Sequence, residues 1–417
     1  MKIAIIGSGI SGLTAAYILN RKHQITVFEK NNYIGGHTHT HDLEYDGKNW
    51  AVDSGFIVYN EQTYPNFISL LDQIGVDRQI TRMGFSVTSR NYDLEYAGHS
   101  LNALFAQRSN LFKPSFHRML YSMLRFNKES RNDLGSLSMD TTLGKYLLDN
   151  HYPDEFINHY IVPIGAAIWS TVPLDMMNIP AIFFIRFFDN HGLLQIIDRP
   201  KWWVIKGGSK SYIEKLVIDF KENIRISTPV HKVVRNDDKN ISITFGKGTL
   251  HTDSFDAVIF ATHSNQSIRL LDKPTKLERE ILGSIPYQVN EALLHYDQTV
   301  LPKRKIAWSS WNYFLDQGDG KPVALTYNMN ILQGLVCDRT FCVTLNSEGL
   351  INPDKIIKRL SYEHPLFTVE GIKAQKRKQE ISGKNNTYFC GAYWHNGFHE
   401  DGVVSALDVC SQFGETL

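Results

Sequence analysis

The chain has 417 residues, which is long enough for two domains that each bury a hydrophobic core. Its 44 lysines and arginines balance 43 aspartates and glutamates, so no global charge attracts it to nucleic acid. The four cysteines form no C-x-x-C pair and no disulfide-dense pattern, which favours a reducing, cytoplasmic compartment. No apolar run is long enough to span a bilayer, and we expect no secretory signal because the chain opens on a strand pattern.

The first twenty residues carry the motif that organises the chain. The apolar run Lys2–Ile6 predicts a buried parallel strand, and Gly7, Gly9 and Gly12 follow it with G-x-G-x-x-G spacing. In this pattern the first glycine allows a tight turn, the second lets backbone approach a pyrophosphate, and the third lets a helix pack on the strand. We expect that helix over 13–20, with its free N–H groups directed at the phosphate. The pattern predicts a dinucleotide site.

The next segment favours FAD over NAD as the dinucleotide. A second expected strand, Gln24–Phe28, ends at Glu29, where an acid can accept hydrogen bonds from a ribose and repels a 2′-phosphate. Gly35 and Gly36 follow soon after. A glycine pair there lets the chain double back beneath the pyrophosphate and run along a long, extended cofactor, which FAD requires and a simple NAD site does not.

Later elements follow from turn signals and apolar runs. Residues 43–50 contain Tyr-Asp-Gly-Lys-Asn, typical of a hairpin with an Asp-Gly turn, and a helix closed by Gly75 is expected over 64–75. Gly55 either lies against an isoalloxazine ring or simply marks a bend. Further strands are expected at 202–205, 224–234, 241–245, 249–252, 255–261, 292–296, 323–327 and 341–345, and helices at 211–220 and 403–410.

Residues 98–128 contain no acid and alternate basic with aromatic side chains. The residues concerned are Arg108, Lys113, Arg118, Arg125 and Lys128, with Phe105, Phe112, Phe116, Tyr121 and Phe126. This pattern predicts amphipathic helices against anionic lipid, where each cation contributes about 1 kcal/mol. The alternative is a helical cap with a solvated basic face. The apolar segment 179–188 either lines a hydrophobic substrate tunnel or is ordinary core.

The end of the chain predicts a second contact with the cofactor. A strand, Gly391 and a helix entered through Asp401-Gly402 would place a positive helix end near the flavin, stabilising its anionic form by about 0.3–2 kcal/mol. Tyr393 and His395 are the candidate catalytic residues, because they follow the strand aimed at the flavin; simple packing would place them in the same way.

The sequence gives no sign of a metal site. His37, His39 and His41 alternate and would share one strand face, which is compatible with zinc, but no carboxylate or cysteine completes a ligand set. No nucleophile-base triad is recognisable, and none is needed where FAD supplies the redox chemistry.

Several of these motifs together resemble the flavin-containing amine oxidase superfamily, which includes monoamine oxidases, protoporphyrinogen oxidase and carotenoid desaturases. They are the glycine motif at 7–12, Glu29, Gly35-Gly36, Thr228-Pro-Val230, and the segments 256–262 and 391–402. The segments 37–40, 52–60, 308–312, 326–330, 362–367 and 397–402 resemble one subgroup more closely. Its members are similar to the amino-terminal oxidase-like domain of plant cyclopropane fatty acid synthases and are associated in bacteria with lipid-methylating enzymes.

The resemblance implies an α/β fold with a Rossmann-like FAD-binding domain of the glutathione-reductase-like, amine oxidase type, and a second α+β substrate domain. The FAD domain would comprise residues 1–90, 200–286 and 380–417, and the substrate domain 91–199 and 287–379. The implied cofactor-binding residues are Gly7, Gly9, Ile10, Ser11, Gly12, Glu29, Lys30, Gly35, Gly36, His37, Gly55, Phe56, Val230, Gly391, Gly402 and Val403. Many relatives carry arginine where this chain has His37, so phosphate binding could weaken as His37 loses its proton.

The implied function is an FAD-dependent oxidoreductase that transfers hydride from a hydrophobic substrate, a lipid acyl chain, to flavin N5. Two alternatives stay open: an amine oxidase that releases hydrogen peroxide, and a flavin-bound, lipid-binding partner of a lipid methyltransferase. The expected partners are a small-molecule or lipid substrate, such a methyltransferase and an anionic membrane. The expected location is the cytoplasm, in peripheral contact with the inner face of the membrane.

Overall fold

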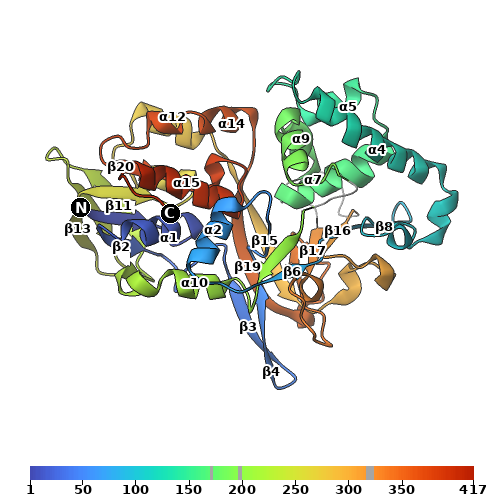
Figure 1. Ribbon diagram of the computed structural model, residues 1–417, viewed down its shortest axis with the longest axis horizontal. Helices are drawn as coiled ribbons and strands as arrows, with labels where there is room; N and C mark the ends of the chain where they lie inside the picture. Colours follow the sequence, from blue (N-terminus) through green and yellow to red (C-terminus); the bar gives the residue numbers. More distant parts are fainter. Residues whose placement is uncertain (170–171, 196–199, 316–323) are drawn as a thin grey trace.

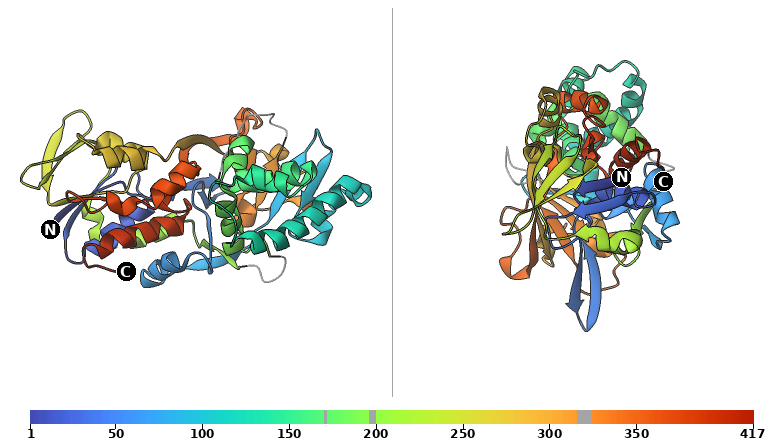
Figure 2. Two further views of the ribbon diagram at one scale, coloured as in Figure 1. Left: turned by 90° about the horizontal axis from the view of Figure 1, so that it is seen from above. Right: turned by 90° about the vertical axis from the view of Figure 1, so that its left-hand side faces the viewer.

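The computed structural model describes residues 1–169, 172–195, 200–315 and 324–417. A parallel sheet with its helices occupies one end, a larger mixed sheet lies in the middle, and a helical lobe covers the far end (Figure 1). Both termini lie at the end that holds the parallel sheet, as two further views show (Figure 2). Among the described residues no helix is both long and apolar enough to cross a bilayer.

The parallel sheet assembles strands from distant parts of the chain. Its order is β10-β2-β1-β14-β20, with β1 (Lys2–Ile6), β2 (Gln24–Phe28), β10 (Ile224–Arg225), β14 (Ala257–Phe260) and β20 (Thr387–Phe389). All four pairings are parallel. The central strands are buried because both faces of the sheet are covered, which explains why they are continuous apolar runs.

Alternate side chains of β1 enter two different cores, as expected for a strand. Ile3 and Ile5 face a layer of helices, and Ala4 and Ile6 face a small antiparallel sheet with helices beside it. The first layer contains α1 (Ile10–Leu19), α2 (Pro65–Gln73), α10 (Lys210–Leu216) and α15 (His399–Ser411). The second contains β11 (Val230–Arg235), β12 (Ile241–Phe245), β13 (His251–Phe255), α11 (Ser264–Leu270), α12 (Lys276–Gly283) and α14 (Val369–Gln375).

A seven-stranded sheet forms the middle of the molecule, in the order β19-β15-β18-β17-β16-β7-β8. Its strands are β7 (Phe85–Ser89), β8 (Leu94–Ala97), β15 (Tyr287–His295), β16 (Trp311–Phe314), β17 (Ala324–Asn328), β18 (Cys342–Leu345) and β19 (Ile356–Pro365), with α13 (Met329–Leu332) after β17. A hairpin of β3 (Thr40–Tyr45) and β4 (Lys48–Asp53) projects from the body (Figure 1). A third small sheet holds β5 (Val58–Asn60), β6 (Arg78–Thr81) and β9 (Trp202–Ile205).

The helical lobe folds around its own aromatic core. Its helices are α3 (Leu101–Leu104), α4 (Pro114–Asp133), α5 (Leu143–Asp149), α6 (Asp154–Phe156), α7 (Val162–Trp169), α8 (Pro173–Asn178) and α9 (Ala181–Asn190). Phe126, Phe156, Phe184 and Phe188 are fully buried there. The lobe core is separate from the cores on the parallel sheet, which fits an inserted unit.

The structure confirms most of the predicted elements and corrects two. The strands at 2–6 and 24–28 and the Asp-Gly hairpin are confirmed. The single strand predicted at 224–234 is wrong, since Ser227 has a left-handed φ of 51° and Pro229 cannot donate to a ladder, so β10 and β11 lie in different sheets. The strand predicted at 249–252 is displaced to His251–Phe255. Val323, the first residue of one predicted strand, lies outside the described residues.

Candidate functional site

The three glycines of the opening motif meet different surroundings. A Cβ added to Gly7 would lie 2.7 Å from the carbonyl oxygen of Ala261, and one on Gly12 would lie 2.0 Å from that of Gly7. Gly9 has no described atom within 4 Å of an added Cβ. Packing therefore requires glycine at positions 7 and 12, whereas Gly9 borders open space, which is what a close approach to a pyrophosphate needs.

The amino end of α1 faces that space without a capping partner. No described side chain caps the helix, and its first turn contains no acid. Gly36 lies alongside, because its added Cβ would come 3.0 Å from Cα of Gly9, and the Gly35 N–H donates to the Ser8 carbonyl at 2.9 Å. The two glycine segments therefore border one space, and the unpaired N–H groups of the helix can receive an anion there.

Glu29 is buried at the end of β2. One oxygen accepts hydrogen bonds from the Ser8 N–H at 3.1 Å and the Ser8 hydroxyl at 2.6 Å, and the other accepts from the Asn31 N–H at 2.8 Å. A carboxylate offers about four lone-pair sites, so it retains capacity for a ribose hydroxyl. The Thr228 N–H donates to the Glu29 carbonyl, which brings the start of β11 and Val230 to the same end of the sheet.

The last helix packs directly on the first. A Cβ on Gly402 would lie 2.6 Å from Cγ2 of Ile10 and 3.0 Å from Oγ of Ser11, and Val403 is fully buried in the same core. The amino ends of α1 and α15 therefore lie side by side although almost 400 residues separate them. Lys30, by contrast, is exposed.

Gly55 is explained by a backbone contact. Its added Cβ would lie 2.0 Å from the His37 carbonyl oxygen, which accepts the Phe56 N–H at 2.8 Å. The Phe56 ring stacks on His399, the first residue of α15, with ring centroids 3.6 Å apart. Burial lowers the pKa of His399 to about 3, so this ring is neutral at neutral pH. The absence of a side chain at Gly55 thus lets the chain after β4 pack directly against the backbone of His37.

Tyr393 and His395 lie in packed surroundings. Tyr393 is buried in the core that contains β14 and β20, and the Gln375 side chain donates to the backbone carbonyls of Tyr393 and His395 at 2.8 and 2.7 Å. The Tyr393 hydroxyl and His395 Nε2 are buried without a hydrogen-bond partner among the described residues. Burial raises the pKa of Tyr393 well above its usual value, so it stays protonated.

An aromatic contact that the sequence analysis missed joins α9 to the segment before α15. Phe187 stacks on Phe398 with centroids 5.0 Å apart, and Phe183 stacks on Phe367 at 5.1 Å. Phe183 and Phe187 are four residues apart, so they share one face of α9. We call these four rings the aromatic wall. One feature of the sequence could have pointed to this contact: Phe398 lies in the segment 397–402, directly before a helix that begins with acidic residues.

The structure shows the segment 179–188 as packed core, and the substrate tunnel stays a prediction. Phe184, Ile185, Phe187 and Phe188 are buried in the lobe core, and Phe183 and Phe187 also contact Phe367 and Phe398.

The alternating histidines diverge. His39 stacks between Tyr33 and His41, while His37 turns to His364 and His263. In the described part of the chain, no group of three or more His, Cys, Asp or Glu side chains is disposed to hold a metal ion.

The parallel sheet, the glycine loop with open space beside Gly9 and the buried acid after β2 define a dinucleotide-binding α/β protein. The sequence profile described as flavin containing amine oxidoreductase matches residues 10–329. The chain belongs to this family and is an FAD-dependent oxidoreductase by class. The open space beside Gly9 and the uncapped α1 fit the pyrophosphate of FAD.

Curated relatives match only short segments. A 1-hydroxycarotenoid 3,4-desaturase from Flavobacterium sp. (strain P99-3) is 42% identical over 80 residues, which are 19% of this chain and 15% of that protein. A 4,4'-diapophytoene desaturase from Staphylococcus aureus (strain Newman) is 57% identical over 37 residues, or 9% of this chain and 7% of the relative.

Solved structures share the whole fold at low sequence identity. A fatty acid isomerase from P. acnes that produces CLA has a TM-score of 0.69 at 15% identity, covering 99% of this chain and 98% of that one. Putrescine oxidase with bound putrescine has a TM-score of 0.70 at 14% identity, covering 99% of both chains. Cyclohexylamine oxidase from Brevibacterium oxydans IH-35A has a TM-score of 0.68 at 13% identity, also covering 99% of both. These likenesses establish the α/β architecture.

Proposed function

We propose that this FAD-dependent oxidoreductase oxidises a hydrophobic substrate, a lipid acyl chain, by hydride transfer to flavin N5. The observation that carries the proposal is the aromatic wall, because stacked apolar rings between the helical lobe and the start of α15 suit an acyl chain. The short matches to two desaturases, whose names describe carotenoid-type substrates, agree with an apolar substrate.

FAD supplies the hydride acceptor itself when bound. The protein's task is to bind the substrate carbon, orient it and exclude water. The groups around the aromatic wall suit a neutral substrate. The His191 ring stacks on the Phe187 ring with centroids 3.8 Å apart. Burial lowers the pKa of His191 to about 4, which keeps the ring uncharged at neutral pH. Asp401 accepts the Phe398 N–H at 2.8 Å, and burial raises the pKa of Asp401 to about 7, so its charge is partial at neutral pH.

The test is reduction of the bound flavin by candidate donors without oxygen. Unsaturated or methylated phospholipids should bleach the flavin absorption band, and Phe187→Leu and Phe398→Leu should slow the bleaching. Phe184→Leu, on the same helix but with its ring against Trp169 and Phe188, is the matched control and should not. Peroxide release from polyamines or aromatic amines, without bleaching by any lipid, would replace this proposal with an amine oxidase.

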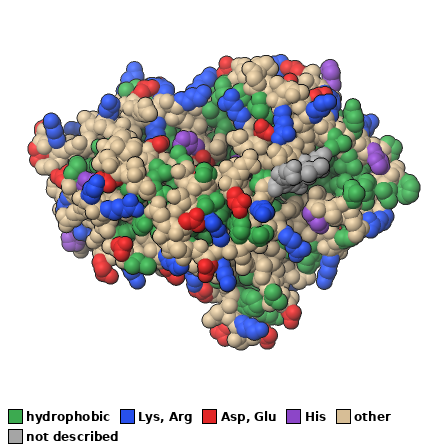
Figure 3. All heavy atoms as spheres, viewed as in Figure 1, with side chains coloured by type: hydrophobic (Ala, Val, Ile, Leu, Met, Phe, Trp, Pro, Cys, Tyr) green, Lys and Arg blue, Asp and Glu red, His purple; other side chains and the backbone are tan. Residues whose placement is uncertain are grey.

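We also propose that the outer face of the lobe docks on an anionic membrane. The exposed residues of α4 recur at helical spacing, and they include Arg118, Tyr121, Leu124 and Lys128. Phe112, just before α4, is 86% exposed and Tyr121 is 68% exposed. Apolar and basic side chains gather on the lobe at the right of the space-filling view (Figure 3).

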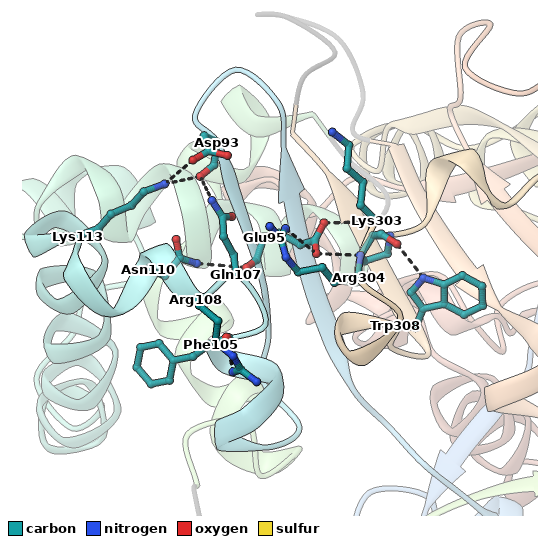
Figure 4. Close-up of polar contacts among 11 residues, drawn as sticks. Asp93, Glu95, Phe105, Gln107, Arg108, Asn110, Lys113, Lys303, Arg304 and Trp308 are labelled. Carbon is teal, nitrogen blue, oxygen red and sulfur yellow. Dashed lines mark hydrogen bonds and ion pairs between the residues drawn. The ribbon is translucent and has the colours of Figure 1, made fainter.

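Other residues of the predicted basic aromatic segment have structural tasks. Phe116 and Phe126 are buried in the lobe core. Lys113 pairs with Asp93, whose backbone carbonyl accepts from Gln107, at the base of the lobe (Figure 4). Figure 4 also shows the neighbouring Glu95 carboxylate on β8, which accepts the backbone N–H groups of residues 303 and 304 and so ties that loop to the edge of the middle sheet. The membrane proposal therefore depends on fewer residues than the sequence suggested.

Vesicle flotation tests this surface. The protein should float with vesicles that contain phosphatidylglycerol and stay behind with pure phosphatidylcholine, and Phe112→Ser with Leu124→Ser should abolish flotation. Val336→Ser, which removes a side chain that is 92% exposed outside the lobe, is the control. Equal binding to neutral vesicles, or flotation of the double variant, would contradict the proposal.

We further propose a place beside a lipid methyltransferase, since the segments at 37–40, 52–60 and 362–367 resemble the subgroup that is similar to the oxidase-like domain of plant cyclopropane fatty acid synthases. Such a role predicts cytoplasmic protein at the inner face of the membrane and co-purification with the methyltransferase. A flavin that no donor reduces, in a protein that co-purifies in this way, would favour a binding partner over an enzyme of lipid oxidation.

A further inference from the structure

We propose that a half-buried group of three histidines, His37, His263 and His364, takes up a proton when FAD binds, so that the protein holds FAD more tightly as the pH falls. We call these residues the histidine group. The proposal rests on FAD as the cofactor but on no particular substrate. The ligand group that these histidines would contact is the doubly charged pyrophosphate of the dinucleotide.

The histidine group is assembled from three separate segments. His37 follows the Gly35-Gly36 pair, His263 follows β14, and His364 lies at the end of β19. The ring centroid of His37 is 5.4 Å from that of His364 and 6.1 Å from that of His263. The Tyr362 ring lies 5.1 Å from His37. His263 and His37 follow β14 and β2 at the carboxyl edge of the parallel sheet, and β19 of the middle sheet brings His364 to the same place.

The histidine group lies beside the space at Gly9. Gly36, which directly precedes His37, would place an added Cβ 3.0 Å from Cα of Gly9. His263 follows the strand that pairs with β1, so its loop borders the same carboxyl edge as the glycine motif. A pyrophosphate over Gly9 is therefore within reach of the histidine group.

The His37 ring has one unused nitrogen. Nε2 is buried and has no hydrogen-bond partner among the described residues. A neutral imidazole donates from one of its two nitrogens, whereas the protonated ring donates from both and carries a positive charge. A phosphate oxygen beside the ring therefore favours the protonated form.

The groups that face His37 keep it neutral before FAD arrives. Burial, reinforced by His364, His263 and His399, holds its pKa well below the usual value. Burial likewise lowers the pKa of His364 to about 4 and that of His263 below its usual range.

The other titratable groups nearby are already engaged or distant from the ring. Glu363 bonds to His263 at 3.1 Å, Tyr287 stacks on His263, and Tyr362 bonds to Ser54 at 2.8 Å. Lys30 acts on His263 and opposes its protonation. A pyrophosphate would add two negative charges next to this group, and opposite charge favours the protonated ring. The proton moves from solvent to the His37 ring as FAD enters.

The pH dependence of FAD affinity tests the proposal on the full chain. Between about pH 6 and 9 the dissociation constant for FAD should rise by up to about tenfold per pH unit, the slope for one linked proton. His37→Arg carries a permanent charge, so it should keep FAD with a flat profile. His37→Gln should bind FAD more weakly than the wild type at the acidic end and also give a flat profile.

His295→Gln is the matched control, because His295 is a buried histidine outside this group, bonded to Thr344 on the middle sheet, and should leave the wild-type slope unchanged. A second readout is the heat of FAD binding in two buffers of different ionisation enthalpy, which counts the protons taken up.

A flat profile in the wild type, no proton uptake, or an unchanged slope in His37→Arg would each overturn the proposal. Loss of FAD from His37→Arg at every pH would do so too, because a permanent cation should satisfy the pyrophosphate. Lipids that fail to bleach the flavin would refute the proposed substrate but leave the FAD affinity slope unaffected.

Discussion

Gly9 differs from the other glycines of the motif because the fold itself has room for a side chain there. Gly7 and Gly12 touch backbone atoms, so their identity follows from packing, whereas Gly9 has extended backbone angles that any residue adopts and borders open space. A residue that the fold tolerates but a ligand would not is direct physical support for a ligand at that position.

We therefore expect Gly9→Ala to fold normally and to lose FAD. The added methyl group would occupy the space of the pyrophosphate, and overpacking of this kind costs about 1–3 kcal/mol of binding free energy. The measurements are flavin content after purification and the melting temperature of the FAD-free protein. Gly12→Ala, whose Cβ would lie 2.0 Å from a carbonyl oxygen, should instead lower the melting temperature. Full flavin content in Gly9→Ala would show that the pyrophosphate lies elsewhere.

The charge of His37 is likewise decided by its surroundings in the fold. Its sequence position predicted a titratable replacement for a permanent cation, and the structure shows that burial and other histidines keep it neutral without FAD. The neighbours that decide its charge come from β19 and the loop after β14, so the sequence around His37 could not reveal them.

At the scale of elements, the Asp53 carboxylate connects β4 to three other parts of the structure by hydrogen bonds. It lies at the end of β4 and accepts bonds from the Ser209 N–H and hydroxyl just before α10, from the Thr40 hydroxyl of β3, and from the Gln333 side chain after α13 at 3.0 Å. Asp53 thus connects the hairpin with both the FAD side and the middle sheet. It is fully enclosed, and burial raises its pKa to about 6 despite these bonds.

Asp53→Ala should lower the free energy of unfolding by about 2–5 kcal/mol, because several buried donors lose their acceptor. Asp42→Ala in the same hairpin removes only an exposed ion pair with Lys210 and should cost less than about 1 kcal/mol. Chemical denaturation of both variants provides the comparison. Equal costs would mean that Asp53 does not join these elements.

Helix α9 packs on more than one side. Its apolar segment was compatible with either a substrate tunnel or packing; the described contacts show packing, and the tunnel stays a prediction. Phe184, Phe187 and Phe188 belong to the lobe core, and Phe183 and Phe187 also contact Phe367 and Phe398. The sequence showed the apolar content of α9, but the partners of each face depend on where α15 and the segment after β19 lie.

For the whole molecule, the buried and half-buried histidines predict sensitivity to acid. Burial lowers the pKa of four of them to about 4; they are His39, His191, His295 and His364. Their folded pKa lies below the unfolded value of about 6.5, so the stability they contribute is present above pH 6.5 and is lost as the pH falls toward 4. The raised pKa of Asp53 and Asp401 acts in the opposite direction, but these carboxyls are fewer.

The melting temperature of the FAD-free protein should therefore fall between pH 6.5 and pH 4. His295→Gln should reduce the slope of this fall, because it removes one of the groups that the fold keeps neutral. Thermal unfolding at several pH values measures both effects. A melting temperature that is constant or rises over this range would show that the buried carboxyls outweigh the histidines.

The sequence by itself determined the features that depend on neighbours along the chain. The glycine motif, the buried strands Lys2–Ile6 and Gln24–Phe28, the Asp-Gly hairpin and the acid at Glu29 follow from turn chemistry and from hydrophobic runs only a few residues long. Together they indicated the α/β class and the dinucleotide, which the family match supports.

Only the tertiary structure decided which distant residues meet. The contact of Gly402 with Ile10, the aromatic wall and the histidine group each join segments that are more than a hundred residues apart. No local pattern encodes such a contact, because it depends on how the sheets and the helical lobe pack against one another. The physical reason is that backbone preference acts between neighbouring residues, whereas side-chain burial and charge depend on everything that packs around them.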